Sequence, residues 1–264
     1  MRISPNKSRT AARRPPHSAL HAREPLHQQV RDQIIRGLAE GEWKPGELLP
    51  NEGRLADRFG VSVSTIRAAI GHLVNAKVLA RKQGKGTFVS LHAERRGIYQ
   101  FFHVVRNDGV KELPVSEVLF LKRGQPDDET ADLLRLPRSA RLSEVYKIRN
   151  VLKVSGVPVV FSDITVPVAL LPGLSEKKLR EGGPTLYAVY QTHFGLNIVR
   201  TVEQLRAGRT DPAAAKVFGI TTQDPLLHIR RIAYTYNDVP CEVRESRIDT
   251  RNYFYLYDQS GTSD

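Results

Sequence analysis

The sequence contains very little sulfur and no long apolar segment, and these absences narrow the class of protein. Its 264 residues include one cysteine, Cys241, and one methionine. A single cysteine excludes a disulfide framework and is typical of a reducing compartment. No apolar run approaches the roughly 18 residues that a membrane span needs. The basic N-terminus also lacks the apolar core of a secretory signal. We therefore expect a cytoplasmic protein without a membrane partner.

Catalytic and metal-binding motifs are missing as well. The eight histidines are scattered, and there is no His-Glu-x-x-His, no Gly-x-Ser-x-Gly and no zinc-ligand spacing. The run Gly84-Lys85-Gly86 resembles part of a phosphate-binding loop, but Leu79 stands where that motif requires its first glycine. We expect no catalytic residue, no metal and no cofactor.

Positive charge is abundant and unevenly distributed. The net charge is +12, and the segment from Met1 to Arg95 contributes +9 of it, with 17 Lys and Arg against 8 Asp and Glu. A basic front end is typical of proteins that contact a polyanion such as nucleic acid. A solvated basic surface would give the same balance, so charge alone leaves both readings open.

The first ordered segment has the pattern of three helices and a hairpin. Apolar residues recur at helical spacing at Leu26, Val30, Ile34 and Leu38. Pro25 suits a first-turn position, and Asn51 and Ser62 can cap a second and a third helix. Strands predicted at 78–82 and 87–90 flank a glycine-rich tip.

Three helices and a basic hairpin describe a winged helix, whose second and third helices form a helix-turn-helix. The third helix then enters the major groove of double-stranded DNA. Arg67 can contact guanine or phosphate there, although a lone exposed arginine is more often a solvated charge. The predicted DNA-binding residues are Arg54, Ser62, Ser64, Thr65, Arg67, Gln83, Gly84, Lys85 and Gly86.

This segment resembles the GntR-type bacterial regulators over about 65 residues. The motifs are Leu48-Leu49-Pro50-Asn51-Glu52, Phe59-Gly60-Val61-Ser62, Thr65-Ile66-Arg67 and the run Arg81 to Val89. The resemblance implies a DNA-binding transcription factor, usually a homodimer and often a repressor. Gly53 and Val63 stand where arginine is common in the family, which leaves the base preference open; Arg54 is the nearest substitute for the first.

The C-terminal half contains an internal repeat of strand, helix, strand and strand. The first copy is predicted at 115–121, 127–136, 141–154 and 159–166, and the second at 199–207, 211–218, 226–236 and 241–248. A further helix is expected at 185–194. Two such units predict an α+β domain with a largely antiparallel sheet.

This half resembles the effector-binding UTRA domain of the HutC-like branch of that family, which shares its fold with chorismate lyase. The motifs are Gly156-Val157-Pro158, Leu171-Pro172-Gly173-Leu174, Thr185-Leu186-Tyr187 and the run Glu242 to Tyr253. The resemblance implies a small, often anionic or polar effector between the two halves of the sheet.

Strand alternation and the start of the predicted helix supply candidate effector contacts. They are Lys147, Arg149, Thr185, Glu242, Arg244 and Ser246. Solvated charges paired across the sheet would give the same pattern. Ser162 and Ile248 stand where sugar-phosphate-sensing relatives carry a carboxylate and an aromatic side chain, which disfavours a hexosamine phosphate as the effector.

The chain is thus expected to comprise a disordered basic arm (1–23), a winged helix-turn-helix (24–91), a linker (92–111), an effector-binding and dimerisation domain (112–258) and a tail (259–264). The leading hypothesis is a homodimeric regulator that binds an inverted-repeat operator, associates with the nucleoid when bound, and responds to a small anionic effector. The alternatives are a DNA-binding dimer without a small-molecule effector and a lyase-like activity in the C-terminal domain.

Overall fold

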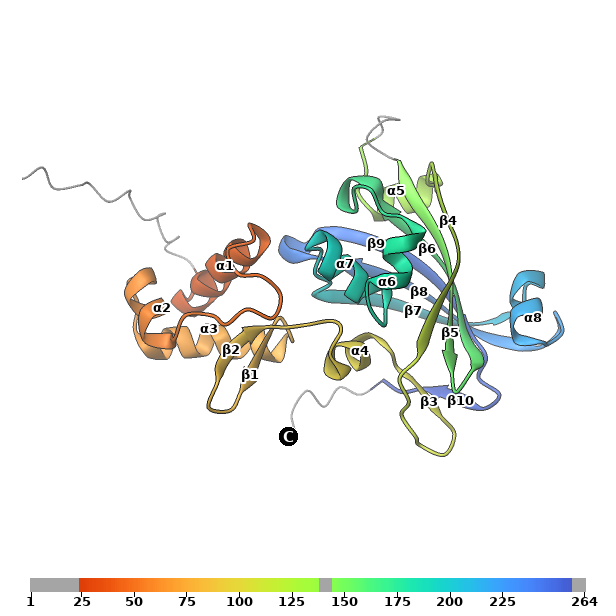
Figure 1. Ribbon diagram of the computed structural model, residues 1–264, viewed down its shortest axis with the longest axis horizontal. Helices are drawn as coiled ribbons and strands as arrows, with labels where there is room; N and C mark the ends of the chain where they lie inside the picture. Colours follow the sequence, from red (N-terminus) through yellow and green to blue (C-terminus); the bar gives the residue numbers. More distant parts are fainter. Residues whose placement is uncertain (1–23, 138–143, 258–264) are drawn as a thin grey trace, which may run out of the picture.

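The computed structural model describes residues 24–137 and 144–257 (Figure 1). The segments 1–23 and 258–264, which contain the predicted arm and tail, and residues 138–143 lie outside the described residues. A helical N-terminal unit is followed by a large twisted sheet with helices, which confirms the predicted α+β class. In the part of the chain that is described, no helix is long and apolar enough to cross a membrane.

The N-terminal unit is a winged helix. Its elements are α1 (Leu26–Ala39), α2 (Glu52–Phe59), α3 (Val63–Asn75), β1 (Leu79–Lys82) and β2 (Gly86–Val89). The Asn51 side chain accepts the backbone N–H of Arg54 at 2.9 Å, and the Ser62 hydroxyl accepts that of Thr65 at 3.2 Å. Both residues are therefore helix caps, as their sequence contexts predict. Pro25 lies at the N-cap of α1 instead of in its first turn.

The three helices pack around a shared apolar core. On α3, Ile66, Ile70 and Leu73 are at most 1% exposed. The wing strands β1 and β2 are antiparallel, and Leu48 forms a bridge to Phe88 at their edge. The burial of one face of α3 leaves its opposite face in solvent, which is the arrangement a recognition helix requires.

The C-terminal part is built on one six-stranded sheet, with strand order β4-β5-β6-β9-β8-β7. The strands are β4 (Val115–Gly124), β5 (Val145–Val154), β6 (Val157–Pro167), β7 (Arg200–Arg209), β8 (Pro225–Tyr234) and β9 (Pro240–Ile248). All neighbouring pairs are antiparallel. The two predicted repeats form the two halves of the sheet, and they meet where β6 pairs with β9.

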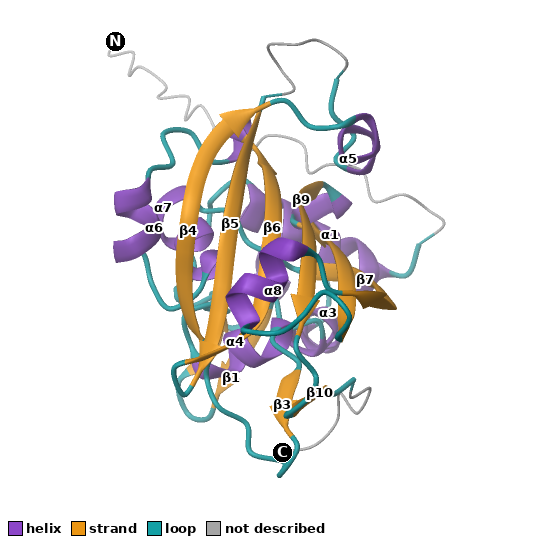
Figure 2. Ribbon diagram, turned by 90° about the vertical axis from the view of Figure 1, so that its right-hand side faces the viewer, coloured by secondary structure: helices purple, strands orange, loops and turns teal. Residues whose placement is uncertain are grey.

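Helices cover both faces of this sheet (Figures 1 and 2). They are α5 (Asp128–Leu133), α6 (Glu176–Glu181), α7 (Leu186–Phe194) and α8 (Pro212–Phe218). Helices α6 and α7 pack on one face, against residues such as Tyr146 and Ile164. Helix α8 packs on the other, against Val151 and Phe161. Successive residues of a strand point to opposite faces of the sheet and therefore contact different helices.

The predicted linker has secondary structure of its own. It contains α4 (Arg95–Phe101) and β3 (Val104–Arg106), and β3 pairs with β10 (Tyr253–Tyr255). Ile98, Phe101 and Phe102 are each no more than 9% exposed. These apolar side chains bury against the sheet, which explains why the segment does not extend freely into solvent.

The linker is also fixed to the C-terminal domain next to the wing. The backbone N–H of His92 donates to Gln191 Oε1 at 2.9 Å, and Gln191 Nε2 donates to the Ser90 carbonyl at 3.0 Å. The backbone N–H of Ile198 donates to His92 Nε2 at 3.1 Å. Helix α7 therefore holds the chain at the point where the winged helix ends.

The contact made by His92 predicts a dependence of stability on pH. Burial lowers the pKa of His92 from 6.5 to about 4. The unfolded chain binds more protons than the folded protein between these values, so the free energy of unfolding falls as the pH drops from about 6.5 towards 4. The shift corresponds to at most about 3 kcal/mol.

Urea unfolding at about pH 7.5 and about pH 4.5 measures this loss. His92→Gln keeps a hydrogen-bond acceptor without the titration and should reduce the pH dependence. His193→Asn, on the exposed side of α7, should leave it at full size. Equal pH dependence in His92→Gln and the wild type would assign the effect to other groups.

Candidate functional site

The exposed face of α3 presents an arginine that an acidic residue of α2 holds in place. Arg67 retains 64% of its side-chain exposure and binds Glu52 through Nε at 3.1 Å and Nη2 at 2.9 Å. Arg81 of β1 reaches the other oxygen of Glu52 at 3.4 Å. Glu52 thus gathers one arginine from α3 and one from the wing, and it pre-orients both guanidinium groups.

The other predicted DNA-binding residues lie around this arginine pair. Arg54, Ser64 and the tip residues 83–86 are exposed. The Ser62 hydroxyl lies 2.8 Å from Thr65 Oγ1, and Thr65 is half-buried. Thr65 therefore supports the start of α3 more than it projects from it. Gly84 and Gly86 have φ angles of 69° and 109°, which glycine adopts without strain.

A pocket opens between the sheet, the start of α7 and the linker, with about 730 Å³ of empty space including its mouth. Its polar lining comes from both halves of the sheet and from α7: Asn150, Thr185, Tyr187, Arg231, Arg244 and Ser246. Linker residues, among them His92, Ile98 and Phe102, form one wall. The pocket is therefore shared between the linker and the C-terminal domain.

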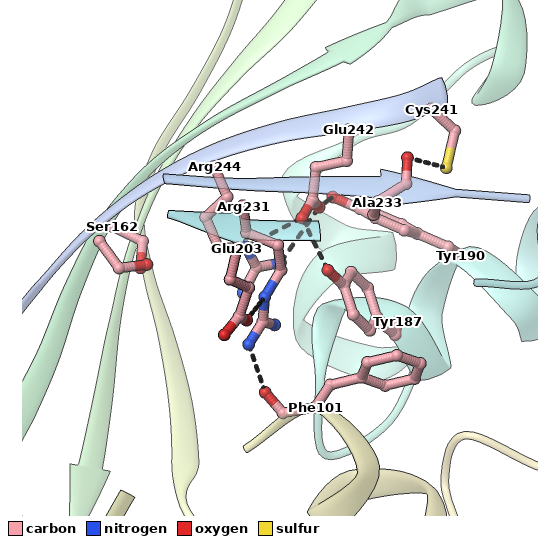
Figure 3. Close-up of polar contacts among 11 residues, drawn as sticks. Phe101, Ser162, Tyr187, Tyr190, Glu203, Arg231, Ala233, Cys241, Glu242 and Arg244 are labelled. Atoms are coloured by element: carbon pink, nitrogen blue, oxygen red, sulfur yellow. Dashed lines mark hydrogen bonds and ion pairs between the residues drawn. The ribbon is translucent and has the colours of Figure 1, made fainter. Parts of the chain in front are cut away.

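A buried carboxylate organises the polar end of the pocket (Figure 3). Glu242 has no exposed surface, and Arg244 contacts it with Nε at 2.9 Å and Nη2 at 3.0 Å. The hydroxyls of Tyr187 and Tyr190 donate to it at 2.9 and 3.0 Å. Both tyrosines lie on α7, so this carboxylate ties the helix to β9.

A second ion pair lies beside the first. Arg231 donates through Nε to Glu203 and through Nη2 to the Phe101 carbonyl at 2.6 Å. Tyr255 of β10 also donates to Glu203. Arg231 therefore links β8 to the last residue of the linker helix α4 (Figure 3).

Burial and neighbouring charges shift the pKa values of these groups. Burial raises the pKa of the Tyr187 hydroxyl, and the charge of Glu242 raises it further. Burial alone would lower the pKa of Arg244, but attraction to Glu242 outweighs it and the pKa is raised. Burial lowers the pKa of His103. At neutral pH the cations that line the pocket are thus Arg231 and Arg244.

The structure brings together part of the predicted effector set. Thr185, Arg244 and Ser246 line the pocket, and Glu242 lies behind Arg244. The Thr185 hydroxyl accepts the N–H of Ala188 at 3.2 Å and caps α7.

Lys147 and Arg149 are not brought to the pocket. Arg149 binds Asp163 at 2.7 Å and stacks over Phe161, on the face that α8 covers. Alternation along β5 puts Lys147 on this same face, while Asn150 faces the pocket.

Sequence reasoning missed Arg231, although the internal repeat contains a signal for it. Arg149 and Arg231 lie at equal distances before the Val-Pro of their copies, yet they face opposite sides of the sheet. The first copy turns through Ser155 and Gly156, whereas the second turns through the 3-10 segment Tyr236–Asp238. A shift of one residue in the pairing after such a connection moves every side chain of a strand to the opposite face of the sheet.

Two family models match the chain. The model for bacterial regulatory proteins of the gntR family matches residues 26–89, and the model for the UTRA domain matches residues 111–253. The two matches coincide with the winged helix and with the six-stranded sheet and its helices.

Relatives of known name are similar over most of their length. The chain is 26% identical to the helix-turn-helix-type transcriptional repressor NagR of Bacillus subtilis (strain 168), covering 88% of this chain and 94% of the relative. It is 25% identical to the transcriptional regulator SmoD of Agrobacterium fabrum (strain C58), covering 83% and 89%.

Among solved structures, the ligand-binding domain of a regulator assigned to the GntR family, from Bordetella bronchiseptica, is 31% identical with a TM-score of 0.56. The alignment covers 61% of this chain and 98% of that domain. The chain therefore combines a winged helix that exposes arginines, a UTRA-type sheet that lines a pocket, and similarity to named regulators over most of their length. It belongs to the GntR family of DNA-binding transcription regulators and carries a UTRA effector domain.

Proposed function

We propose that this protein is a homodimeric repressor that binds an inverted-repeat operator and is switched by a small anionic metabolite. The observation that carries the proposal is the position of Arg231. It lines the pocket and simultaneously holds the last turn of the linker helix through the Phe101 carbonyl. A ligand that binds the Arg231 guanidinium therefore acts directly on the linker, which connects the pocket to the winged helix.

The coupling follows from the walls of the pocket. A ligand shifts an equilibrium only by binding one arrangement better than another. Because Ile98 and Phe102 of the linker line the pocket and His92 joins the linker to α7, a ligand contacts both parts that set the position of the winged helix. In a symmetric dimer this position determines whether two recognition helices reach half-sites about 34 Å apart, or a multiple of that.

Supporting this role, the DNA-facing groups are charged and accessible. Arg67, Arg81 and Lys85 are exposed, and contacts from such groups to phosphates make affinity fall steeply with salt. Glu52 holds two of them in the free protein. Binding to DNA therefore exchanges or shares these ion pairs with phosphates and bases.

The first prediction concerns operator binding. Arg67→Ala should weaken binding to an operator selected from random duplexes by about 1–3 kcal/mol, because it removes a base or phosphate contact and leaves Glu52 facing the DNA. Arg36→Ala removes the same charge from the last turn of α1 and is the matched control. A gel-shift titration measures both. Equal affinities for Arg67→Ala and the wild type would remove Arg67 from the interface.

The second prediction concerns the switch. The double variant Arg231→Met with Glu203→Gln removes both partners of the pocket ion pair without leaving an unpaired buried charge. It should lose its response to metabolites that stabilise the wild type in a thermal-shift screen, measured as the change in operator affinity that each metabolite causes.

Arg149→Met with Asp163→Asn removes a more exposed ion pair on the opposite face of the sheet and should keep the full response. Arg247, which also binds Asp163, keeps Asp211 as a partner in this variant. A screen of organic acids, sugar phosphates and amino acids in which nothing stabilises the wild type or alters operator affinity would leave a DNA-binding dimer without a small-molecule effector.

A further inference from the structure

The pocket is mainly apolar outside its two arginines. Its aliphatic and aromatic wall includes six side chains from the linker and the sheet: Ile98, Phe101, Phe102, Val160, Ile229 and Ile248. Among the described lining residues, no carboxylate is present. A ligand therefore reaches guanidinium N–H donors but no carboxylate in the lining, and the pocket favours an anion with an apolar remainder.

The hydroxyl groups that line the pocket already have partners. Tyr187 donates to Glu242, and Tyr255 donates to Glu203. Ser246 shares a hydrogen bond with Ser162 at 2.8 Å. Recognition of a sugar requires a set of polar groups for its several hydroxyls, because an unmatched buried hydroxyl costs free energy. Groups committed to protein partners are poorly suited to that task.

The charge of the polar end limits the charge of the ligand. Two buried carboxylates, Glu203 and Glu242, neutralise Arg231 and Arg244. Each guanidinium has five N–H donors, and these ion pairs occupy only part of them. One carboxylate can use the remaining donors and adds a single negative charge to this buried, neutral cluster, whereas a phosphate dianion would add two.

We propose that the effector is a monocarboxylic acid with an apolar body, aromatic or branched aliphatic, and not a sugar phosphate. This inference rests on the proposed function. The carboxylate binds Arg231 and Arg244, and the body packs against Phe101, Phe102 and Ile248. An acid held in this way contacts α4, β8 and β9 at once, which fits the coupling described above.

Matched probes test this class on the full-length protein by isothermal titration calorimetry. Phenylacetate and isocaproate supply both features, acetate lacks the apolar body, and phenylethanol lacks the carboxylate. Glucose 6-phosphate represents the sugar phosphates. We expect at least one of the two acids to bind, and removal of either feature to weaken binding by about tenfold or more. Glucose 6-phosphate should not bind or compete.

The double variant Arg231→Met with Glu203→Gln should weaken binding of the acid by about tenfold or more, and the opposite-face variant Arg149→Met with Asp163→Asn should not. If both variants lose binding, or if neither does, the acid does not bind at the pocket arginines as proposed.

The outcomes distinguish a wrong ligand class from a wrong proposed function. Binding of glucose 6-phosphate with a change in operator affinity, and none by either acid, would overturn the ligand class and leave the proposed regulator intact. Acid binding that phenylethanol matches would overturn the role of the arginines. No binding by any probe or by any metabolite of the wider screen would overturn both the ligand class and the small-molecule switch.

Discussion

The buried carboxylate of Glu242 is the constraint on which the effector domain depends. A charge without solvent exposure is stable only when it is paired and hydrogen-bonded, and here Arg244, Tyr187 and Tyr190 together meet this need. Because the tyrosines belong to α7 and the arginine to β9, satisfying one carboxylate fixes a helix against the sheet. The mouth of the pocket, the cap at Thr185 and the attachment of His92 all follow from the position of this helix.

The linker forms one wall of the pocket as well as connecting the two domains. Its helix α4 buries apolar side chains against the sheet and accepts a hydrogen bond from Arg231 at its C-terminal end. A wall formed by such a segment can move only at a cost in buried apolar area, so the free protein has a defined arrangement of its two domains. In the proposed switch, a small ligand that contacts this wall differently in two arrangements shifts the position of the winged helix.

Much of the fold could be predicted from local patterns. Helical spacing and cap residues located α1, α2 and α3, and Asn51 and Ser62 cap as their contexts predict. The internal repeat located the strands of the sheet and its antiparallel character. The site was harder to predict from the sequence. Alternation places Lys147 and Arg149 on one face of the sheet but does not indicate which face the pocket uses. The sequence also gives no reason to expect that residues of a linker line the pocket.

The sequence pattern alone determined the winged helix, its basic charge, the sheet built from two repeats and the residues at the start of α7. These features depend on periodicity and caps within short segments. The tertiary structure alone decided that Arg231 faces the pocket while Arg149 faces α8, that Glu203 and Glu242 neutralise the two arginines, and that Ile98 and Phe102 close one wall. The physical reason is that these facts depend on strand register and on contacts between segments far apart in sequence, and one residue in a connecting turn is enough to reverse a face.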